Sequence, residues 1–482
     1  MTDDSSRTRR PARGRVVIVL DAEIDGVPGL ALRISDGRID DIGLSLSADG
    51  ATEVIDARGG AVIPGLHDHH LHLHATAADA ASVRCGPPAV LNRRALSTAL
   101  AEASADEHGW VRGVGYVDTV AGDLDAVALD ALHASRPVRV QHRSGAMWIL
   151  NTAALVAAHI TDAAHPGVEC SADGVPTGRI WRADTWLRSR LPLTTPPPLG
   201  SLGATLTGYG ITGVTDATPD LSTGSQAALV TAALEGDLPQ RLHLLGVPLR
   251  GASAHNSAPL PEQVSVGPYK IVIADSGLPP FDALVDRIRA AHRDGRAVAV
   301  HCVSRAALLL LLAALDVAGD FPGDRVEHAA LVPADSIADL RRHGLRVITQ
   351  PGFLSQRGDY YLDHVEPDDL DDLYRCRSLL ADGVPLAMSS DSPYGPLDPW
   401  AVIAAASRRA TETGTTLNAG ECLTPAQALA GYLTPADDPG GRPRRIRRGS
   451  PADLVILRAP LEQVLREPSA DAVDRTLFAR AR

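Results

Sequence analysis

Histidine is concentrated in one short segment near the start of the chain, where positions 67–74 read HDHHLHLH. Alternation along a β-strand would place His70, His72 and His74 on one face, with Asp68 in line. Two imidazoles two residues apart at a strand end can chelate one divalent metal ion, because neutral imidazole is a good ligand for zinc. The segment therefore predicts a metal site, and hydrogen-bonded histidines inside the protein are the alternative interpretation.

Lysine occurs at a single position, Lys270, although lysine and arginine together number 46. It lies in the β-branched run YKIVIAD, which is typical of a strand. Burial allows a lysine to lose its proton, whereas arginine stays protonated at any reachable pH. The neutral amine could form a Schiff base, act as a base, or react with carbon dioxide to give a carbamate. The alternative is that Lys270 has no function and remains by chance in a sequence whose codon bias favours arginine.

Three further residues of metal-ligand type lie at the ends of strand-like runs. His301 follows AVAV, His328 follows DRVE and Asp391 follows VPLAMSS. The carboxyl ends of parallel barrel strands meet at one face, so these residues and the histidine segment are expected to converge there. A carbamate on Lys270 would supply a bridging anion for two divalent ions in one pocket. A water between the ions would have its pKa lowered toward neutrality, and Asp391 could accept its proton.

Eight strand-like runs, most of them followed by a helical stretch, must position these residues. From the fourth to the sixth run the spacing is about 30 residues, which is the length of a βα unit. This pattern predicts an α/β fold, a (β/α)8 TIM barrel over residues 64–443. The expected strands lie within 61–74, 210–218, 241–248, 269–275, 297–303, 324–330, 345–351 and 384–391.

Both ends of the chain read as small β-sheets. Residues 15–63 alternate β-rich runs with turns and residues 444–482 echo the pattern, so a composite β-sandwich formed by both termini is expected. The polar, Arg-rich residues 1–14 predict a disordered tail. The first two barrel strands are much further apart than one βα unit, which predicts a long insertion, about 75–205, after barrel strand 1. We expect this insertion to consist of extra helices and loops that cap the barrel mouth.

Composition narrows the class of protein. The net charge is −12, which argues against nucleic-acid binding because that function needs a positively charged surface. The basic run RPRRIRR at 442–448 is predicted to be a solvated loop. Five cysteines occur without a CxxC pair, as expected of reduced thiols. No apolar run approaches the roughly 20 residues that a membrane span needs. A cytoplasmic protein with no nucleic-acid or membrane partner is therefore predicted.

The segments PGLHDHHLH at 64–72 and GSPADLVIL at 449–457 resemble the opening and closing motifs of the amidohydrolase superfamily. Lysine on the fourth strand, histidines on the fifth and sixth and an aspartate on the eighth extend the resemblance over nearly the whole chain. The resemblance implies two divalent metal ions, with zinc the expected metal, and Lys270 carboxylated as N6-carboxylysine. It implies that one ion is held by His70, His72, Lys270 and Asp391, and the other by Lys270, His301 and His328.

Three segments of the insertion narrow the resemblance to one branch. GWVRGVGY at 109–116, HRSGAMWILNTAAL at 142–155 and DGVPTGRIW at 173–181 resemble the branch that contains N-substituted formamide deformylases. A small-molecule substrate is implied, together with a homodimer by analogy. Candidate substrate contacts lie in the insertion and after the seventh and eighth strands, with packing as the alternative role. They are His142, Arg143, Trp148, Gln350 and Tyr394.

The expected activity is hydrolysis of a non-peptide carbon–nitrogen bond, as in an amide, formamide or cyclic amide. A metal-bridging hydroxide would attack the carbonyl, with Asp391 as the catalytic general base. An ester or lactone hydrolase, or a deaminase, could use the same site. A Schiff-base lyase using Lys270 is an alternative from another class, and it leaves the histidines unexplained. A scaffold that has lost catalysis is a third interpretation, and metal content together with turnover would separate the three.

Overall fold

The computed structural model describes residues 15–162, 165–192, 197–249, 259–274 and 277–479. The chain forms two compact units, of which the first comprises Met1–Leu73 and Leu199–Arg482 and the second comprises His74–Pro198. The tail expected over residues 1–14 lies outside the described residues.

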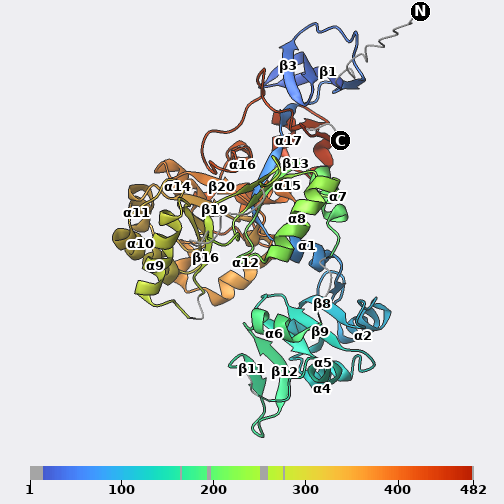
Figure 1. The fold of residues 1–482 in the computed structure, drawn as a ribbon, viewed down its shortest axis with the longest axis vertical. Helices are drawn as coiled ribbons and strands as arrows, with labels where there is room; N and C mark the ends of the chain where they lie inside the picture. The colour runs from blue at the N-terminus through green and yellow to red at the C-terminus, as the bar shows by residue number, and fades with distance from the viewer. Residues whose placement is uncertain (1–14, 163–164, 193–196, 250–258, 275–276, 480–482) are drawn as a thin grey trace, which may run out of the picture. The chain divides into compact units, whose positions relative to one another are not determined.

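Two parallel sheets form the centre of the first unit (Figure 1). One has the order β15-β14-β13-β6, and the other has the order β16-β17-β18-β19-β20. The strands of the first are β6 (Leu66–Leu71), β13 (Ile211–Asp216), β14 (Arg241–Leu244) and β15 (Val264–Val266). Those of the second are β16 (Tyr269–Val272), β17 (Val298–Cys302), β18 (Arg325–His328), β19 (Arg346–Thr349) and β20 (Leu386–Met388). Each of the eight expected runs contains one of these strands, and β15 is an additional strand that sequence reasoning missed.

The two sheets are connected at both of their outer edges. At one edge only Gly267 and Pro268 separate β15 from β16. At the other edge the Asp391 N–H donates to the His70 carbonyl at 2.8 Å, and the His72 N–H donates to the Ser392 carbonyl at 2.9 Å. The segment after β20 is therefore bound to the carboxyl end of β6 by backbone hydrogen bonds.

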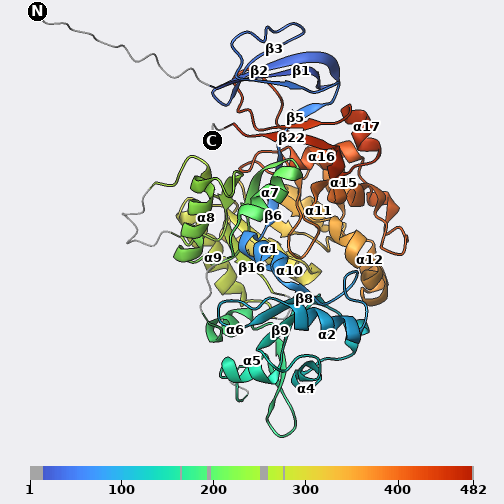
Figure 2. The same cartoon turned by 90° about the vertical axis from the view of Figure 1, so that its right-hand side faces the viewer.

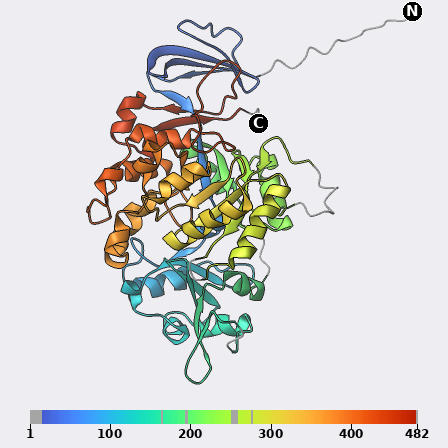
Figure 3. The ribbon, with the colours of Figure 1, turned by 90° about the vertical axis from the view of Figure 1, so that its left-hand side faces the viewer.

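Helices follow the parallel strands and lie outside them. Figure 3 shows α9 and α10, in yellow, side by side on the outside of the second sheet. Helix α10 buries Leu308, Leu311 and Leu315, whose spacing of three or four residues makes one apolar stripe. Its N-cap is Ser304, whose hydroxyl accepts a hydrogen bond from the Ala307 N–H at 3.2 Å. Among the described residues, no helix combines the length and apolar character that crossing a bilayer requires.

The helices of this unit have the following bounds. They are α7 (Gly200–Gly208), α8 (Thr223–Glu235), α9 (Phe281–Arg293), α10 (Arg305–Ala318), α11 (Ser336–Arg342), α12 (Gly352–His364), α13 (Pro367–Leu370), α14 (Cys376–Ala381), α15 (Pro399–Arg408), α16 (Pro425–Tyr432) and α17 (Leu461–Arg466). Short 3-10 turns cover Ala419–Glu421 and Ala470–Ala472. Helix α1 (Leu73–Ala80) begins directly after β6 and continues into the second unit.

Both ends of the chain contribute to a second core of the first unit. One sheet has the order β3-β2-β1-β4, and the other has the order β22-β21-β5 (Figure 2). Buried side chains from both sheets form one apolar cluster, which includes Val19, Leu32, Leu454 and Ile456. The strands are β1 (Val16–Ile24), β2 (Val27–Ser35), β3 (Arg38–Gly43), β4 (Glu53–Asp56), β5 (Val62–Pro64), β21 (Leu454–Leu457) and β22 (Val473–Leu477).

The second unit is built on a six-stranded sheet with the order β11-β12-β10-β9-β8-β7. Its strands are β7 (Val83–Arg84), β8 (Val111–Tyr116), β9 (Val138–His142), β10 (Met147–Leu150), β11 (Val168–Cys170) and β12 (Pro176–Trp181), and its helices are α2 (Arg93–Glu102), α3 (Asp118–Ala121), α4 (Ala126–Asp130), α5 (Thr152–Ala157) and α6 (Asp184–Arg190). The expectation of helices and loops alone was wrong for this segment. Its strands are short, and β10 is buried at all four positions, so no alternation marks it in the sequence.

Candidate metal centre

Strand β6 presents its histidines on two different faces. His67 Nε2 lies 2.9 Å from Thr215 Oγ1 and His69 Nε2 lies 2.9 Å from Thr434 Oγ1, so both rings have hydroxyl partners away from the metal candidates. Asp68 and His70 face the other way, as alternation requires. The expected alternation does not continue to His74, because β6 ends at Leu71 and helix α1 begins at Leu73.

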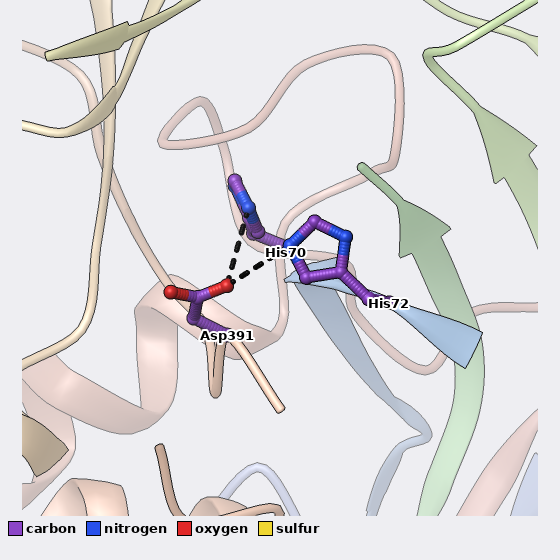
Figure 4. A group of neighbouring side chains, drawn as sticks. All are labelled: His70, His72 and Asp391. Carbon is purple, nitrogen blue, oxygen red and sulfur yellow. Dashed lines mark ion pairs between the residues drawn. The ribbon is translucent and has the colours of Figure 1, made fainter. Parts of the chain in front are cut away.

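The structure brings His70, His72 and Asp391 together (Figure 4). One potential ligand atom from each lies within 4.8 Å of the others. Asp391 Oδ1 is 3.2 Å from His72 Nε2 and 3.5 Å from His70 Nε2. Two imidazole nitrogens and a carboxylate oxygen in this arrangement are a suitable donor set for one divalent ion.

His301 and His328 lie beside this group. The ring centroids of His301 and His328 are 4.4 Å apart, and those of His70 and His328 are 4.7 Å apart. His328 Nδ1 is 3.7 Å from Asp391 Oδ2. Lys270 is buried, and its charge contributes, after burial, to the lowered pKa of His70, of His301 and of His328, which indicates that it lies near these rings. His70, His72, His301, His328 and Asp391 therefore gather at or just after the carboxyl ends of the parallel strands, whereas Lys270 is the second residue of β16. That the six residues act together as metal ligands stays a prediction.

Burial sets the protonation of these groups. It lowers the pKa of His70 and His328 well below the ordinary histidine value, and lowers the pKa of His301 to about 3. Burial also lowers the pKa of Lys270, against the opposing effect of the Glu327 and Asp391 carboxylates. Neutral imidazoles with free lone pairs are the form that binds metal ions.

Three buried polar atoms of this group have no hydrogen-bond partner among the described residues. They are His70 Nε2, Asp391 Oδ1 and Lys270 Nζ. Buried polar atoms are normally hydrogen-bonded, and leaving one unpaired costs about 1–3 kcal/mol. His70 Nε2 and Asp391 Oδ1 are 3.5 Å apart and belong to a group of three metal-ligand side chains, so the residues present fit a bound cation.

Glu327 and Arg325 support the centre and were missed by sequence reasoning. The Glu327 carboxylate contacts His70 Nδ1, and Glu327 Oε1 also forms an ion pair with Arg325 Nε at 2.6 Å. A carboxylate on one ring nitrogen orients the imidazole and leaves the other nitrogen for a metal. The signal in the sequence was two charged residues at alternate positions of a strand that is buried throughout.

The backbone is strained at two of the candidate ligands. His328 has φ of 72° and Asp391 has φ of 52°, both in the left-handed region. A non-glycine residue there costs roughly 1–2 kcal/mol, and such residues cluster at functional sites. At Asp391 the conformation is fixed by the hydrogen bond from its N–H to the His70 carbonyl and by the Tyr394 N–H, which donates to the Asp391 carbonyl at 2.9 Å.

Two of the predicted substrate contacts lie close to this centre. Gln350 is buried, with its Oε1 at 2.9 Å from His328 Nδ1, and its Nε2 donates to Ser389 Oγ at 2.9 Å. Tyr394 is 39% exposed, and the centroid of its ring is 5.8 Å from that of His72 in an edge-on arrangement. Tyr394 thus has the accessible surface that a substrate contact needs, whereas Gln350 is turned toward a candidate ligand.

The other three predicted contacts belong to the second unit. Trp148 is buried there, its Nε1 donates to Asp184 Oδ1 at 2.8 Å, and the guanidinium of Arg112 lies 5.4 Å from the centre of its ring. His142 Nδ1 lies 2.8 Å from Ser144 Oγ, and Arg143 is exposed. The part that these three residues play in substrate binding stays a prediction.

Parallel strands that present histidines and an aspartate at their carboxyl ends define a metal-binding α/β protein. Residues 53–479 match the amidohydrolase family, and the chain belongs to that family. The resemblance expected from the sequence is therefore confirmed.

Named relatives and a solved structure agree with this family. The chain is 25% identical over 464 residues to a Bacillus subtilis protein named as amidohydrolase YtcJ, covering 84% of this chain and 85% of the relative. It is 25% identical over 498 residues to the N-substituted formamide deformylase of Arthrobacter pascens, covering 90% of each chain. Its fold is similar to that of an uncharacterized metal-dependent hydrolase from Pyrococcus horikoshii, with a TM-score of 0.73, 20% identity, and coverage of 91% of this chain and 96% of that one.

Proposed function

We propose that this protein is a metal-dependent hydrolase that cleaves a non-peptide carbon–nitrogen bond in a small molecule, such as an amide, formamide or cyclic amide. Membership of the amidohydrolase family supports a hydrolase of such bonds. The observation that carries the proposal is the convergence of His70, His72 and Asp391, with His70 Nε2 and Asp391 Oδ1 buried and without a hydrogen-bond partner among the described residues.

The fold assignment supports this function. We infer that the two parallel sheets are the halves of one (β/α)8 barrel over residues 64–443, with an insertion after its first strand. The hydrogen bonds between the segment after β20 and the end of β6 support closure. We also infer that residues 15–63 and 444–482 form one composite sandwich, which their shared apolar cluster supports. Barrel enzymes carry their catalytic groups at the carboxyl ends of the strands, and His70, His301, His328 and Asp391 lie at or just after such ends in this chain.

The metal ligands are assigned as follows. His70, His72, Asp391 and a carboxylated Lys270 would hold one divalent ion, and the same carboxylated Lys270 with His301 and His328 would hold a second. When bound, such ions polarise the substrate carbonyl and lower the pKa of water. Zinc suits a set that is rich in imidazole.

Lys270 takes part as a carbamate. Its neutral amine attacks the carbon of carbon dioxide, a nitrogen–carbon bond forms, and one proton is released, which leaves a side chain with one negative charge. Burial favours the neutral amine that this reaction needs. Arginine cannot do this, because its guanidinium stays protonated. The carboxylate so formed would supply an anionic ligand to the ions when they are bound.

Asp391 moves the proton during hydrolysis. One of its carboxylate oxygens accepts a proton from water as the water oxygen attacks the carbonyl carbon. The same group then donates the proton to the leaving nitrogen as the carbon–nitrogen bond breaks, which yields a carboxylic acid and an amine. Its strained backbone and its hydrogen bond to the His70 carbonyl hold the carboxylate beside both imidazoles. An ester or lactone hydrolase would use the same groups, so the substrate panel must include those bonds.

Metal analysis combined with a substrate panel tests the proposal. The wild type should contain about two equivalents of divalent metal and should hydrolyse at least one member of a panel of N-substituted formamides, amides and cyclic amides. Asp391→Asn should lose turnover. His69→Gln is the matched control, because it changes a histidine of the same strand on the opposite face and a glutamine amide can keep the bond to Thr434. A metal-free protein that forms a borohydride-reducible adduct with a carbonyl substrate would instead favour a lyase that uses Lys270.

A further inference from the structure

A large cavity lies at the end of the parallel strands opposite to the candidate metal centre. Its volume is about 1070 Å³, and its wall includes Pro64, Thr212, Arg241 and Ser265, which lie before or within β6, β13, β14 and β15 toward their amino ends. The candidate metal ligands instead lie at the carboxyl ends of the strands. Much of the rest of the wall comes from the segment between α16 and β21 and from β21 itself, and Ile39 of β3 also contributes. The cavity is therefore a feature separate from the proposed active site.

The wall of this cavity is positively charged. Arginine lines it at five positions and a carboxylate at two, which gives a net formal charge of +3 (five minus two) in a chain whose net charge is −12. The arginines are Arg241, Arg442, Arg444, Arg445 and Arg447, and the carboxylates are Glu262 and Asp453. Only Arg241 is neutralised by an ion pair within this set, with Arg241 Nε at 2.8 Å from Asp453 Oδ2.

Three of these arginines have no side-chain partner among the described residues. The side chains of Arg442, Arg445 and Arg447 are exposed and make no hydrogen bond or ion pair with the described residues. Arg444, in contrast, donates to the Leu433 carbonyl at 3.1 Å and to the Gly65 carbonyl, so its guanidinium fastens this segment to the rest of the unit. The segment is thus held in place by one arginine and presents the other three to the cavity.

A buried polar atom of the wall also lacks a partner. His243 is 5% exposed, and its Nδ1 lies 2.8 Å from Ser265 Oγ, but its Nε2 has no hydrogen-bond partner among the described residues. Burial lowers the pKa of His243 to about 3, so the ring is neutral at physiological pH and can serve as a hydrogen-bonding group.

We propose that this cavity binds a small organic molecule that carries two or more oxyanion groups, phosphate or carboxylate. The planar guanidinium matches both groups because it can donate two parallel hydrogen bonds to their oxygens. The volume is close to the upper end of the range of small-molecule sites and exceeds what a single inorganic anion fills. The arginine-rich run expected to be a solvated loop thereby becomes part of a binding site.

Calorimetric titration of the full-length, metal-loaded protein tests this proposal at fixed ionic strength. The probes are fructose 1,6-bisphosphate, which carries two phosphates, and tricarballylate, which carries three carboxylates. Saturable one-site binding of either probe is expected, and the probe that binds identifies the oxyanion. The double variant Arg442→Gln/Arg445→Gln should weaken binding by about tenfold or more, since each lost guanidinium removes charge-assisted hydrogen bonds.

Arg293→Gln is the matched control, because Arg293 is exposed at the end of α9, away from the cavity wall, and its loss should leave binding unchanged. Urea unfolding should show that the double variant keeps its stability, since neither changed side chain has a partner among the described residues. Wild-type protein that binds neither probe would overturn the proposal. So would binding that is equally tight in the double variant, because that result would place the anion elsewhere, for example at the metal centre.

Discussion

Replacing Glu327 by glutamine would remove one charge from a buried row of three side chains. Glu327 Oε1 is paired with Arg325 Nε at 2.6 Å, and the other carboxylate oxygen contacts His70 Nδ1. Arg325, Glu327 and His70 are all almost completely buried. Glutamine has nearly the same size, so the change acts on charge and hydrogen bonding rather than on packing.

Two losses are expected, and each has its own magnitude. Removing one partner of a buried ion pair leaves the other charge uncompensated, which costs about 3–5 kcal/mol of the free energy of unfolding. Loss of the carboxylate that orients a metal-binding histidine weakens metal binding by about 10–100-fold. The double variant Arg325→Met/Glu327→Leu separates the two effects, because it removes both charges. It should regain most of the stability but not the metal affinity, since His70 Nδ1 still lacks its partner.

Urea unfolding of the metal-free proteins measures the first loss, and competition with a chelator of known affinity measures the second. The reasoning would be refuted by a Glu327→Gln protein that stays within about 1 kcal/mol of wild-type stability and also keeps its metal affinity. A double variant that regained wild-type metal affinity would show that Glu327 acts only on stability and does not position His70.

Three other perturbations probe the same centre. Lys270→Ala should lose the second metal equivalent and turnover, and short carboxylic acids should restore both. Lys270→Arg should resist such rescue because its side chain fills the space. Full metal content and activity in Lys270→Ala would contradict the carbamate. Gln350→Leu removes the acceptor at 2.9 Å from His328 Nδ1 and should weaken metal binding about tenfold, as measured by chelator competition. The free energy of unfolding of the metal-free protein should be highest above about pH 6.5. Below that pH it should fall by up to about 1.4 kcal/mol per pH unit for each buried histidine. The reason is that the unfolded chain takes up protons that buried rings such as His301, with a pKa of about 3, cannot take up. Equal urea midpoints at pH 7 and pH 5.5 would exclude that linkage.

The strands that carry the centre could be predicted because their signal is local. Runs of apolar residues mark strands that are buried on both faces, and ligand-type residues near the ends of several runs mark the edge where parallel strands meet. The period of two in β6 separates His70 from His67 and His69 correctly. It fails at His74, because helix α1 begins at Leu73 and the period changes there.

Other features depend on contacts between distant parts of the chain. Glu327 contacts His70, which is 257 positions away in the sequence, and no short-range sequence pattern predicts that contact. The sheet of the second unit was missed because β7, β10 and β11 have only two to four residues each, too few to show a period. The arginine run at 442–448 resembles any solvated loop until the structure places four of its arginines on the wall of one cavity.

The use of lysine and arginine follows from the charge that each proposed site needs. At the metal centre the basic side chain must lose its positive charge and become an anion, and only a lysine amine can do this in a buried place such as that of Lys270. At the cavity the arginine side chains must stay positively charged to bind an anion, and a guanidinium keeps its proton in such a place. Arg442→Lys or Arg445→Lys would keep the charge but lose the planar group that donates two parallel hydrogen bonds. Lys270 could not become arginine without losing the proposed anion. The different requirements of the two proposed sites can be recognised in the sequence because lysine is so scarce. The chain has 46 lysine and arginine residues, and its single lysine is at the position where the proposed chemistry requires an amine.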